Sequence, residues 1–180
     1  GAGGSAYSGK AVVLTPALPT PPPPDPDPAP IDGEFNLGWE VAADAPIGRH
    51  EAVGTSANGK LYVFGGFTPT LRQINDAHAY DPVTNTWEEL PDLPEPMMHG
   101  SAVFDGVDRI YVAGFFAGPN HFGDGSTTVY VYCITDNTWS TAPALPARQG
   151  AAVMVLVGRN LHFFGGLDPG RTVNSTGHWA

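Results

Sequence analysis

Short apolar runs separated by turn residues recur along the chain from Asn36 onward, and their length predicts strands rather than helices. They come in pairs. An Asn-Gly pair such as Asn58-Gly59 between two runs is a strong hairpin signal, because both central residues of that turn need a positive φ. The expected first strands of these hairpins are residues 52–56, 101–104 and 151–157, and the expected second strands are residues 61–64, 110–113 and 161–164.

The second run of each hairpin is dense in apolar residues, so we expect it to be buried on both faces between neighbouring sheets. A loop of variable length then leads to a third strand, expected at residues 77–80 and 129–133. A fourth strand follows a short polar turn and begins at Trp87 or Trp139, both of which we expect to be buried. Each unit therefore predicts a sheet of four strands.

These units are internal repeats with a period near 50 residues. Trp39, Trp87 and Trp139 lie 48 and 52 residues apart, and the glycines that end the second strands lie 49 and 51 residues apart. A repeat of this length with glycine and aromatic markers is typical of a β-propeller blade. The sequence therefore predicts an all-β fold built from blades.

The repeats resemble the kelch repeat, whose marks are a glycine pair after an apolar strand, then a tyrosine, then a tryptophan. The marks here are Gly65-Gly66, Tyr80 and Trp87 in the first repeat, Gly114, Tyr132 and Trp139 in the second, and Gly165-Gly166 in the third. Phe115 breaks the second glycine pair, and the third repeat stops before its tyrosine and tryptophan. The resemblance implies a kelch-type β-propeller of the galactose-oxidase-like central domain superfamily, with four-stranded blades around a central axis.

Residues 36–180 hold about three such blades, with boundaries near residues 39, 87 and 139. A lone fourth strand carrying Trp39 is expected at residues 38–41, and residues 156–180 end on an incomplete blade. Propellers have 4–8 blades, so three cannot close a ring. We therefore expect either a part of a larger ring or half of a two-copy ring of six blades.

Before the repeats, residues 1–14 are mostly small, with one short apolar run that predicts a strand or the tail of a preceding domain. Residues 15–35 predict a proline-rich linker, with nine prolines between residues 15 and 30. Spacers of this composition typically separate modules of exported proteins. We therefore expect a secreted or cell-surface protein of the bacterial type rather than a cytoplasmic one.

The charge balance narrows the classes of partner. Eight Lys and Arg face eighteen Asp and Glu, for a net charge of -10, which argues against nucleic acid and anionic membrane surfaces. No apolar run approaches the roughly 20 residues of a membrane helix, which argues against membrane insertion. A single cysteine excludes a disulfide framework or a cysteine-based zinc site within this chain. No cofactor or metal motif appears in the sequence.

Residues 115–128 form the longest expected loop and are the best candidate contact surface. The loop offers Asn120, His121, Phe122 and Asp124 among glycines, a combination suited to a carbohydrate or peptide. The alternative is a turn without a partner.

Two further sets of residues recur between repeats. His50 and His99 align with each other and with Gln149, and such positions on inner strands would form a ring near the central channel. Arg49 and Arg148 align in the same way and are candidates for binding a carboxylate. The alternatives are ordinary polar lining for the histidines, and turn capping or salt bridges between blades for the arginines.

Together these features predict a kelch-repeat binding or structural assembly module of an exported protein, contacting protein or glycan through interstrand loops. Its other expected partners are further copies or further blades of the same protein. The alternative is part of a carbohydrate-active kelch enzyme, either a copper oxidase of the galactose oxidase type or a sugar isomerase. Such oxidases use a Tyr–Cys crosslink, but Tyr132 and Cys133 are adjacent on one expected strand and should point to opposite faces. We assign no catalytic residue.

Overall fold

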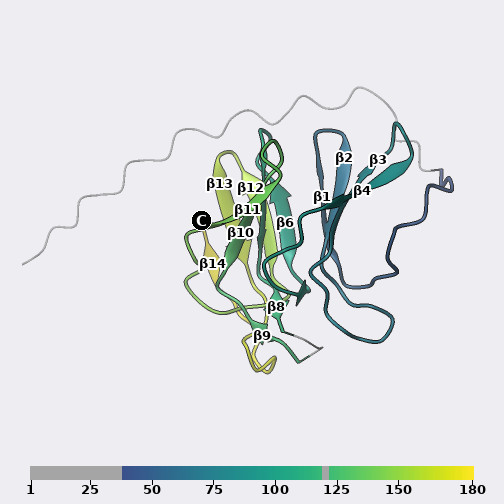
Figure 1. Ribbon diagram of the computed structural model, residues 1–180. Coiled ribbons are helices and arrows are strands. Elements are labelled where there is room, and N and C mark those ends of the chain that lie inside the picture. Colours follow the sequence, from purple (N-terminus) through teal and green to yellow (C-terminus); the bar gives the residue numbers. More distant parts are fainter. Residues whose placement is uncertain (1–37, 119–121) are drawn as a thin grey trace, which may run out of the picture.

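The computed structural model describes residues 38–118 and 122–180, and every element in this part of the chain is a strand (Figure 1). Antiparallel sheets stand side by side as blades. Blade 1 runs β1 (Val53–Ala57), β2 (Lys60–Phe64), β3 (Ala77–Asp81) and β4 (Thr86–Leu90), and blade 2 runs β6 (Ser101–Phe104), β7 (Arg109–Ala113), β10 (Val129–Cys133) and β11 (Thr138–Ala142). Blade 3 has β12 (Val153–Val157), β13 (Asn160–Phe164) and β14 (His178–Trp179). The partial kelch-type propeller predicted from the sequence is therefore confirmed.

The first strand of each blade is the inner one. β6 lies between β1 and β12 and contacts both, so the three first strands gather on one side of the molecule and the later strands fan outward. A side chain also links two of them: the Ser101 hydroxyl accepts the Met154 backbone N–H at 3.0 Å and donates to the Met154 carbonyl at 3.3 Å. The blades thus share an axis at their inner edges.

Two surfaces between neighbouring blades form the larger part of the core, and a third cluster of Phe67, Met98 and Phe116 lies at one end of the blades. Phe64 and Tyr62 of blade 1 pack against Tyr132 and Trp139 of blade 2, with the Phe64 and Trp139 ring centroids 5.3 Å apart. On the other side of blade 2, a smaller cluster joins it to blade 3; its buried members are Ala113, Val129, Ala152, Met154 and Phe163. Alternation of side chains along each strand lets one blade supply both surfaces.

Glycine governs the ends of the second strands. Gly65 and Gly66 have φ of 58° and 98°, and a Cβ on Gly65 would lie 2.5 Å from the Met97 carbonyl oxygen. This is the close backbone approach that the sequence predicts for the glycine pair. In the second repeat Phe115 replaces the second glycine, and there the chain forms a separate small sheet of β5 (Met97–Met98), β8 (Phe116–Ala117) and β9 (Asp124–Gly125).

Three expectations about these elements are wrong. Residues 38–41 form no strand, and Trp39 is completely exposed, because no strand of the described chain lies beside this segment to pair with it. Trp87 and Trp139 are half-buried rather than buried, since they lie on the outermost strand of each blade. β2 is buried on one face only: Leu61 is exposed, because blade 1 has a neighbour on one side alone among the described residues.

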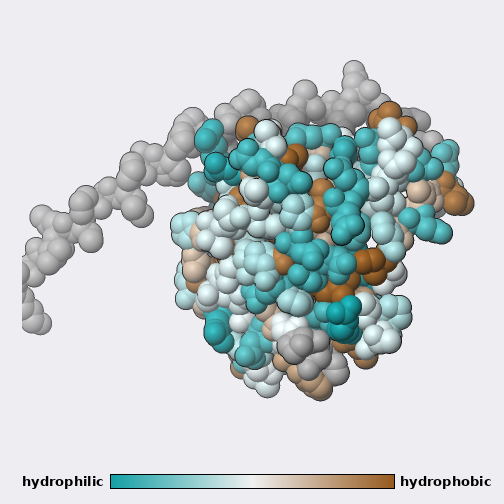
Figure 2. Space-filling view, viewed as in Figure 1, coloured by the Kyte–Doolittle hydropathy of each residue, from teal (hydrophilic) through white to brown (hydrophobic). Residues whose placement is uncertain are grey.

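The expectations for residues 1–14 and 15–35 lie outside the described residues. Within the described ranges, no helix is long and apolar enough to cross a membrane. On the face shown in Figure 2, hydrophobic side chains reach the surface in small separate patches within a largely polar surround.

Candidate functional site

One end of the blades is built from segments of all three repeats, and we call it the loop face. It lies around β8 and β9, at the bottom of Figure 1. Its members are the described residues of the ranges 48–51, 67–74, 97–100, 115–126, 148–151 and 167–175. In each repeat, the segment before the first strand pairs with the segment after the second strand, which pairs in turn with a third segment. The repeat thereby fixes the backbone of this end.

Three equivalent residues of the loop face are joined through their backbones. Glu51, His99 and Ala151 have positive φ of 55°, 52° and 54°. The His99 N–H donates to the Glu51 carbonyl at 3.3 Å, and the Ala151 N–H donates to the His99 carbonyl at 2.9 Å. Each repeat is thus hydrogen-bonded to the next at the residue two positions before its inner strand begins.

This geometry corrects the alignment of the histidines. His99 is equivalent to Glu51 and not to His50, which pairs with Phe67 one residue earlier in its repeat. The cause is the β6–β7 turn, which is one residue longer than the equivalent turns. Ser101 pairs with Ala113, twelve positions later, whereas the end residues of the β1–β2 and β12–β13 hairpins lie eleven positions apart. An alignment counted back from Gly114 is therefore displaced by one residue before β6. The predicted ring of equivalent histidines is therefore wrong.

A carboxylate, an imidazole and an aromatic ring meet at this position. His99 Nε2 lies 3.2 Å from Glu51 Oε2, and both side chains are partly exposed. The His99 ring also stands edge-on to the Phe116 ring, with centroids 6.2 Å apart. The arrangement offers an anionic acceptor and an ionisable donor beside buried apolar surface, which suits a polar ligand with an apolar side.

Arg171 of the third repeat completes this cluster from the neighbouring loop. Its guanidinium lies over the Phe116 ring, 4.0 Å from the centroid, and its Nη2 donates to the Gly123 carbonyl at 3.1 Å. A cation over an aromatic face is held by the ring quadrupole. Sequence reasoning missed Arg171 because its partners come from another repeat. It missed Glu51 because the alignment of the repeats was displaced by one residue and matched His99 to His50 instead.

The loop predicted as a contact surface lies at this end. Asn120 and His121 fall outside the described residues. Phe122 is 77% exposed, and Asp124 is exposed within β9, where its backbone pairs with Ala117. The expectation that the whole of residues 115–128 lies outside strands is wrong, since β8 and β9 form within it.

The two predicted arginines are not equivalent in the structure. The Arg49 guanidinium donates to the carbonyls of Gly65 and Asp76, and its Nη2 lies 2.7 Å from His78 Nδ1. Burial lowers the pKa of His78, and the Arg49 charge lowers it further, so the ring accepts this hydrogen bond in its neutral form. The Arg49 guanidinium is therefore hydrogen-bonded within its own repeat.

Gln149 rather than Arg148 occupies the position equivalent to Arg49. Gln149 is buried, and its Nε2 donates to the Ser175 hydroxyl at 2.6 Å, within the third repeat. Arg148 is exposed beside it. The predicted recurrence of an arginine is therefore wrong. The sequence alignment matched Arg49 with Arg148, but the bridges of His50 with Phe67 and of Gly150 with Leu167 show that the equivalent residue is the next one, Gln149.

The copper oxidase alternative requires a Tyr–Cys crosslink and therefore depends on Cys133, whose thiol is hydrogen-bonded to a carboxylate. Its Sγ donates to Asp108 Oδ2 at 3.0 Å, and this hydrogen bond raises the pKa of Cys133. The adjacent Tyr132 is buried in the core, where its hydroxyl donates to Asn137. Within residues 38–118 and 122–180, no three His, Cys, Asp or Glu side chains form a group that could hold a metal ion.

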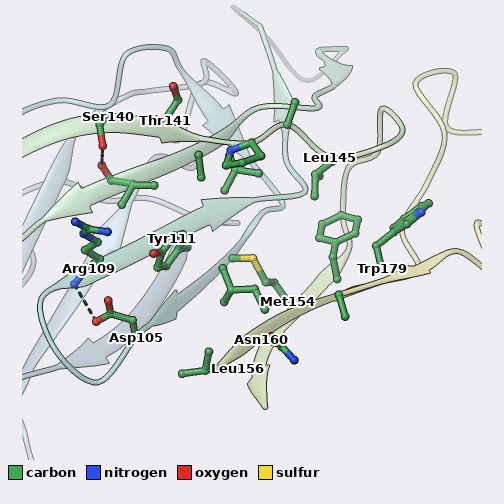
Figure 3. A pocket seen from close by; sticks show the side chains of 18 of the residues that line it. Asp105, Arg109, Tyr111, Ser140, Thr141, Leu145, Met154, Leu156, Asn160 and Trp179 are labelled. Atoms are coloured by element: carbon green, nitrogen blue, oxygen red, sulfur yellow. Dashed lines mark hydrogen bonds between the residues drawn. The ribbon is translucent and has the colours of Figure 1, made fainter. Parts of the chain in front are cut away.

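A second concave feature lies between blades 2 and 3. It is a cleft of about 970 Å³, and Figure 3 shows Tyr111 and Leu145 of blade 2 facing Met154 and Trp179 of blade 3 across it. Its floor is apolar, while Arg109, Ser140 and Thr141 stand toward its rim. Blade 3 is short here, because β14 has only two residues.

Known proteins define the class to which this architecture belongs. A family model described as the KLHDC2/KLHL20/DRC7 Kelch-repeats domain matches residues 38–177. The chain belongs to the kelch-repeat family. Kelch repeats generally mediate protein binding or assembly, and the chain has the repeat architecture for that role.

The individual relatives include proteins named for their kelch repeats and a sugar epimerase. Beta-scruin of Limulus polyphemus is 31% identical over 143 residues, which are 77% of this chain and 16% of that protein. Kelch-like protein terF of Aspergillus terreus is 31% identical over 144 residues, 73% of this chain and 30% of that protein. N-acetylneuraminate epimerase of Pasteurella multocida is 40% identical over 89 residues, 46% of this chain and 23% of that protein. The chain thus spans less than a third of the length of each of these relatives.

Proposed function

We propose that the chain is a binding and assembly module of an exported protein, and that its loop face contacts a protein or glycan partner. The observation that carries the proposal is the cluster of Glu51, His99, Phe116 and Arg171, which joins loops of all the described repeats at one end of the blades. Binding residues concentrate on loops held by a rigid scaffold, and here the scaffold is the set of blades.

The chemistry of the loop face suits such a partner. Phe122 and Asp124 add an exposed ring and an exposed carboxylate to the loop face. Aromatic rings pack against the apolar faces of sugars and peptides, while carboxylates and arginines bind their polar groups. Arginine and aromatic residues are also enriched among the residues that dominate binding energy at protein interfaces.

An array of glycans and peptides, probed with the intact chain, tests this proposal. We expect Phe122→Ala and Arg171→Ala each to weaken a ligand found on the array by about tenfold or more, a loss of about 1.4 kcal/mol. Val107→Ala is the matched control, because Val107 is also 77% exposed but lies in the β6–β7 turn at the other end of blade 2. Equal effects of all three substitutions would place the binding site away from the loop face.

A second candidate is catalysis on a sugar ring. The similarity to N-acetylneuraminate epimerase supports it. The copper oxidase alternative has less support, because the Cys133 thiol is hydrogen-bonded to Asp108. On this reading the chain is a part of a carbohydrate-active kelch enzyme of the isomerase type. Proton NMR of freshly dissolved N-acetylneuraminate, with and without the whole protein, tests it. An unchanged rate of anomer interconversion would exclude this activity.

Export and assembly are further parts of the proposal. The proline-rich composition of residues 15–30 supports a spacer in a secreted or cell-surface protein. Immunoblots of medium, surface and cytoplasmic fractions of the source organism test it, and recovery in the cytoplasm alone would contradict it. The exposed apolar side chains of the terminal blades support assembly with further blades or copies.

A further inference from the structure

The Arg49 side chain connects the loop face to the strands of blade 1. Its Nη1 donates to the Gly65 carbonyl at 3.3 Å and to the Asp76 carbonyl at 3.1 Å. Its Nη2 donates to His78 Nδ1 at 2.7 Å. Gly65 follows β2, Asp76 precedes β3, and His78 lies within β3. The guanidinium therefore holds the loop-face segment 48–51 against the facing ends of two strands.

The hydrogen bond between Arg49 and His78 is compatible with only one protonation state of the imidazole. A guanidinium can only donate, so Nδ1 must accept, and the ring must then be neutral with its proton on Nε2. A protonated ring would place two cationic donors 2.7 Å apart where His78 is only 5% exposed. Little water is present there to screen the repulsion. Protonation of His78 therefore breaks this hydrogen bond.

The other charged groups around His78 are carboxylates. Burial and then the Arg49 charge lower the pKa of His78, and together they outweigh the charges of Asp76, Glu89 and Asp92, which raise it. Glu89 lies directly opposite His78 in the β3–β4 register. The carboxylates are also crowded, because burial and then the charges of Asp76 and Glu89 raise the pKa of Asp92. An imidazolium would therefore find anionic partners as it loses Arg49.

The segment that Arg49 holds also carries a member of the candidate site. The next residue, His50, exchanges two backbone hydrogen bonds with Phe67, at 3.1 and 2.8 Å. Glu51 follows; its carbonyl accepts the His99 N–H, and its carboxylate lies 3.2 Å from His99 Nε2. Displacement of the Arg49 side chain would therefore disturb the backbone that positions the Glu51 carboxylate.

We propose that Arg49 and His78 form a pH-sensitive switch: below about pH 6, His78 is protonated and turns to the carboxylates, Arg49 is released, and segment 48–51 loses its fixed position on the loop face. The direction follows from linkage, because a histidine whose pKa is lower in the folded state destabilises the fold as pH falls below its unfolded pKa. The switch itself does not depend on the proposed function. Its consequence, weaker binding at the loop face in acid, does rest on it.

NMR of the intact chain without any ligand, between about pH 8 and about pH 5, tests the switch. We expect the amide signals of residues 49–51 to shift with the same midpoint as the His78 ring. Protection of the His50 N–H, corrected for the intrinsic exchange rate, should fall about tenfold or more in acid. His78→Asn keeps an acceptor near the place of Nδ1 but does not titrate, so both effects should disappear. His162→Asn, in blade 3, is the matched control and should leave both unchanged.

Arg49→Gln provides a second measurement that keeps His78 in place. It removes one of the two causes that hold the ring neutral, so the midpoint of the His78 titration should rise. An unchanged midpoint, pH-dependent amide signals that persist in His78→Asn, or amide shifts with a different midpoint from the ring would each overturn the proposal.

Binding at the loop face separates the switch from its consequence. A ligand found on the array at about pH 7 should bind at least about tenfold more weakly to the wild type at about pH 5, but not to His78→Asn. Equal affinity at both pH values would overturn the coupling to the loop face while the proposed function stands. If the array yields no ligand, the proposed function fails, and the NMR titration still decides the switch.

Discussion

At the scale of single residues, an asparagine sets the turn before each fourth strand. Asn85 and Asn137 have φ of 55° and 54°, a conformation that asparagine tolerates better than most residues. Their side-chain oxygens accept hydrogen bonds from the hydroxyls of Tyr80 and Tyr132, the tyrosines that mark the repeat. The shared Asn-Thr-Trp sequence therefore encodes both the turn and the partner of a half-buried or buried tyrosine.

We predict that Asn137→Ala lowers the free energy of unfolding by about 2 kcal/mol, because it combines strain at positive φ with an unpaired hydroxyl on Tyr132. Burial raises the pKa of Tyr132 to about 12, so its hydroxyl remains a donor in need of an acceptor at neutral pH. Asn137→Gly removes the strain but not the missing acceptor, so it should cost about half as much. Urea titrations of the two variants measure the difference, and equal losses would contradict the strain argument.

At the scale of elements, the β6–β7 hairpin is distinguished by its longer turn. Asp105 Oδ1 accepts the backbone N–H groups of Val107, Asp108 and Arg109 at 2.8, 2.9 and 3.0 Å. Burial alone would raise the pKa of Asp105, but these three hydrogen bonds outweigh it and hold the pKa below its ordinary value. The carboxylate therefore stabilises the hairpin in its charged form.

The pH dependence of stability follows from the sign of this shift. A group whose pKa is lower in the folded state stabilises the fold above its unfolded pKa and loses that effect as pH falls through the folded pKa. We expect Asp105→Asn to be less stable than the wild type at pH 7 and the difference to shrink below about pH 4. Asp44→Asn, at an exposed position, is the control. Urea titrations at several pH values measure it, and a difference that stays constant with pH would contradict the role of the charge.

The contact between inner strands gives a second prediction at this scale. We expect Ser101→Ala to lower the free energy of unfolding by about 1–3 kcal/mol, because the Met154 N–H and carbonyl lose their side-chain partner at a buried position. Ser56→Ala, at an exposed serine of β1, is the matched control and should change stability by less than about 0.5 kcal/mol. Thermal or urea denaturation measures both. Equal effects would mean that the hydroxyl does not link the blades.

Most strands could be predicted from the sequence because their signals are local. The Asn-Gly turn at Asn58 and the glycine pairs fix the hairpins, and the predicted 129–133 strand coincides with β10. The strand expected at residues 38–41 does not form, since a strand depends on a partner that local sequence does not reveal. For the same reason the half-buried state of Trp139 could not be read from its marker position.

The candidate site was harder to predict than the fold. The loop containing Phe122 and Asp124 was found from its length and composition. The pairing of Glu51 with His99 depends on a one-residue difference in a turn, and the contact of Arg171 with Phe116 joins two repeats. Neither signal lies in a short stretch of sequence, so both required the three-dimensional arrangement.

At the scale of the whole molecule, the described blades form a row with two different outer faces. Equivalent residues show the difference, since Val53 is 3% exposed within the row and Val153 is 53% exposed at its end. The same type of face is therefore a core in one blade and a surface in another. What decides this is the presence of a neighbouring blade, not the sequence of the strand.

This equivalence predicts opposite outcomes for one substitution. Val53→Lys should lower the free energy of unfolding by more than about 3 kcal/mol, because it buries an unpaired charge. Val153→Lys should change it by less than about 1 kcal/mol in dilute solution, where the side chain is in water. Guanidinium titrations compare the two, and a similar loss at both positions would show that the outer face of blade 3 is covered within the same chain.

The Trp87 indole N–H donates to the Ala43 carbonyl at 3.0 Å, and the Trp139 indole N–H donates to the Pro91 carbonyl at 2.8 Å, so one hydrogen bond recurs between successive repeats. This recurrence bears on how such a chain grows during evolution. Donor and acceptor lie 44 residues apart for Trp87 and 48 for Trp139, so each bond spans roughly one repeat. A tandem duplication of one period therefore copies a donor and an acceptor together, wherever its two breakpoints fall. The new repeat receives a carbonyl from the repeat before it and offers one to the repeat after it. Gain or loss of whole repeats thus preserves the contact without any compensating mutation.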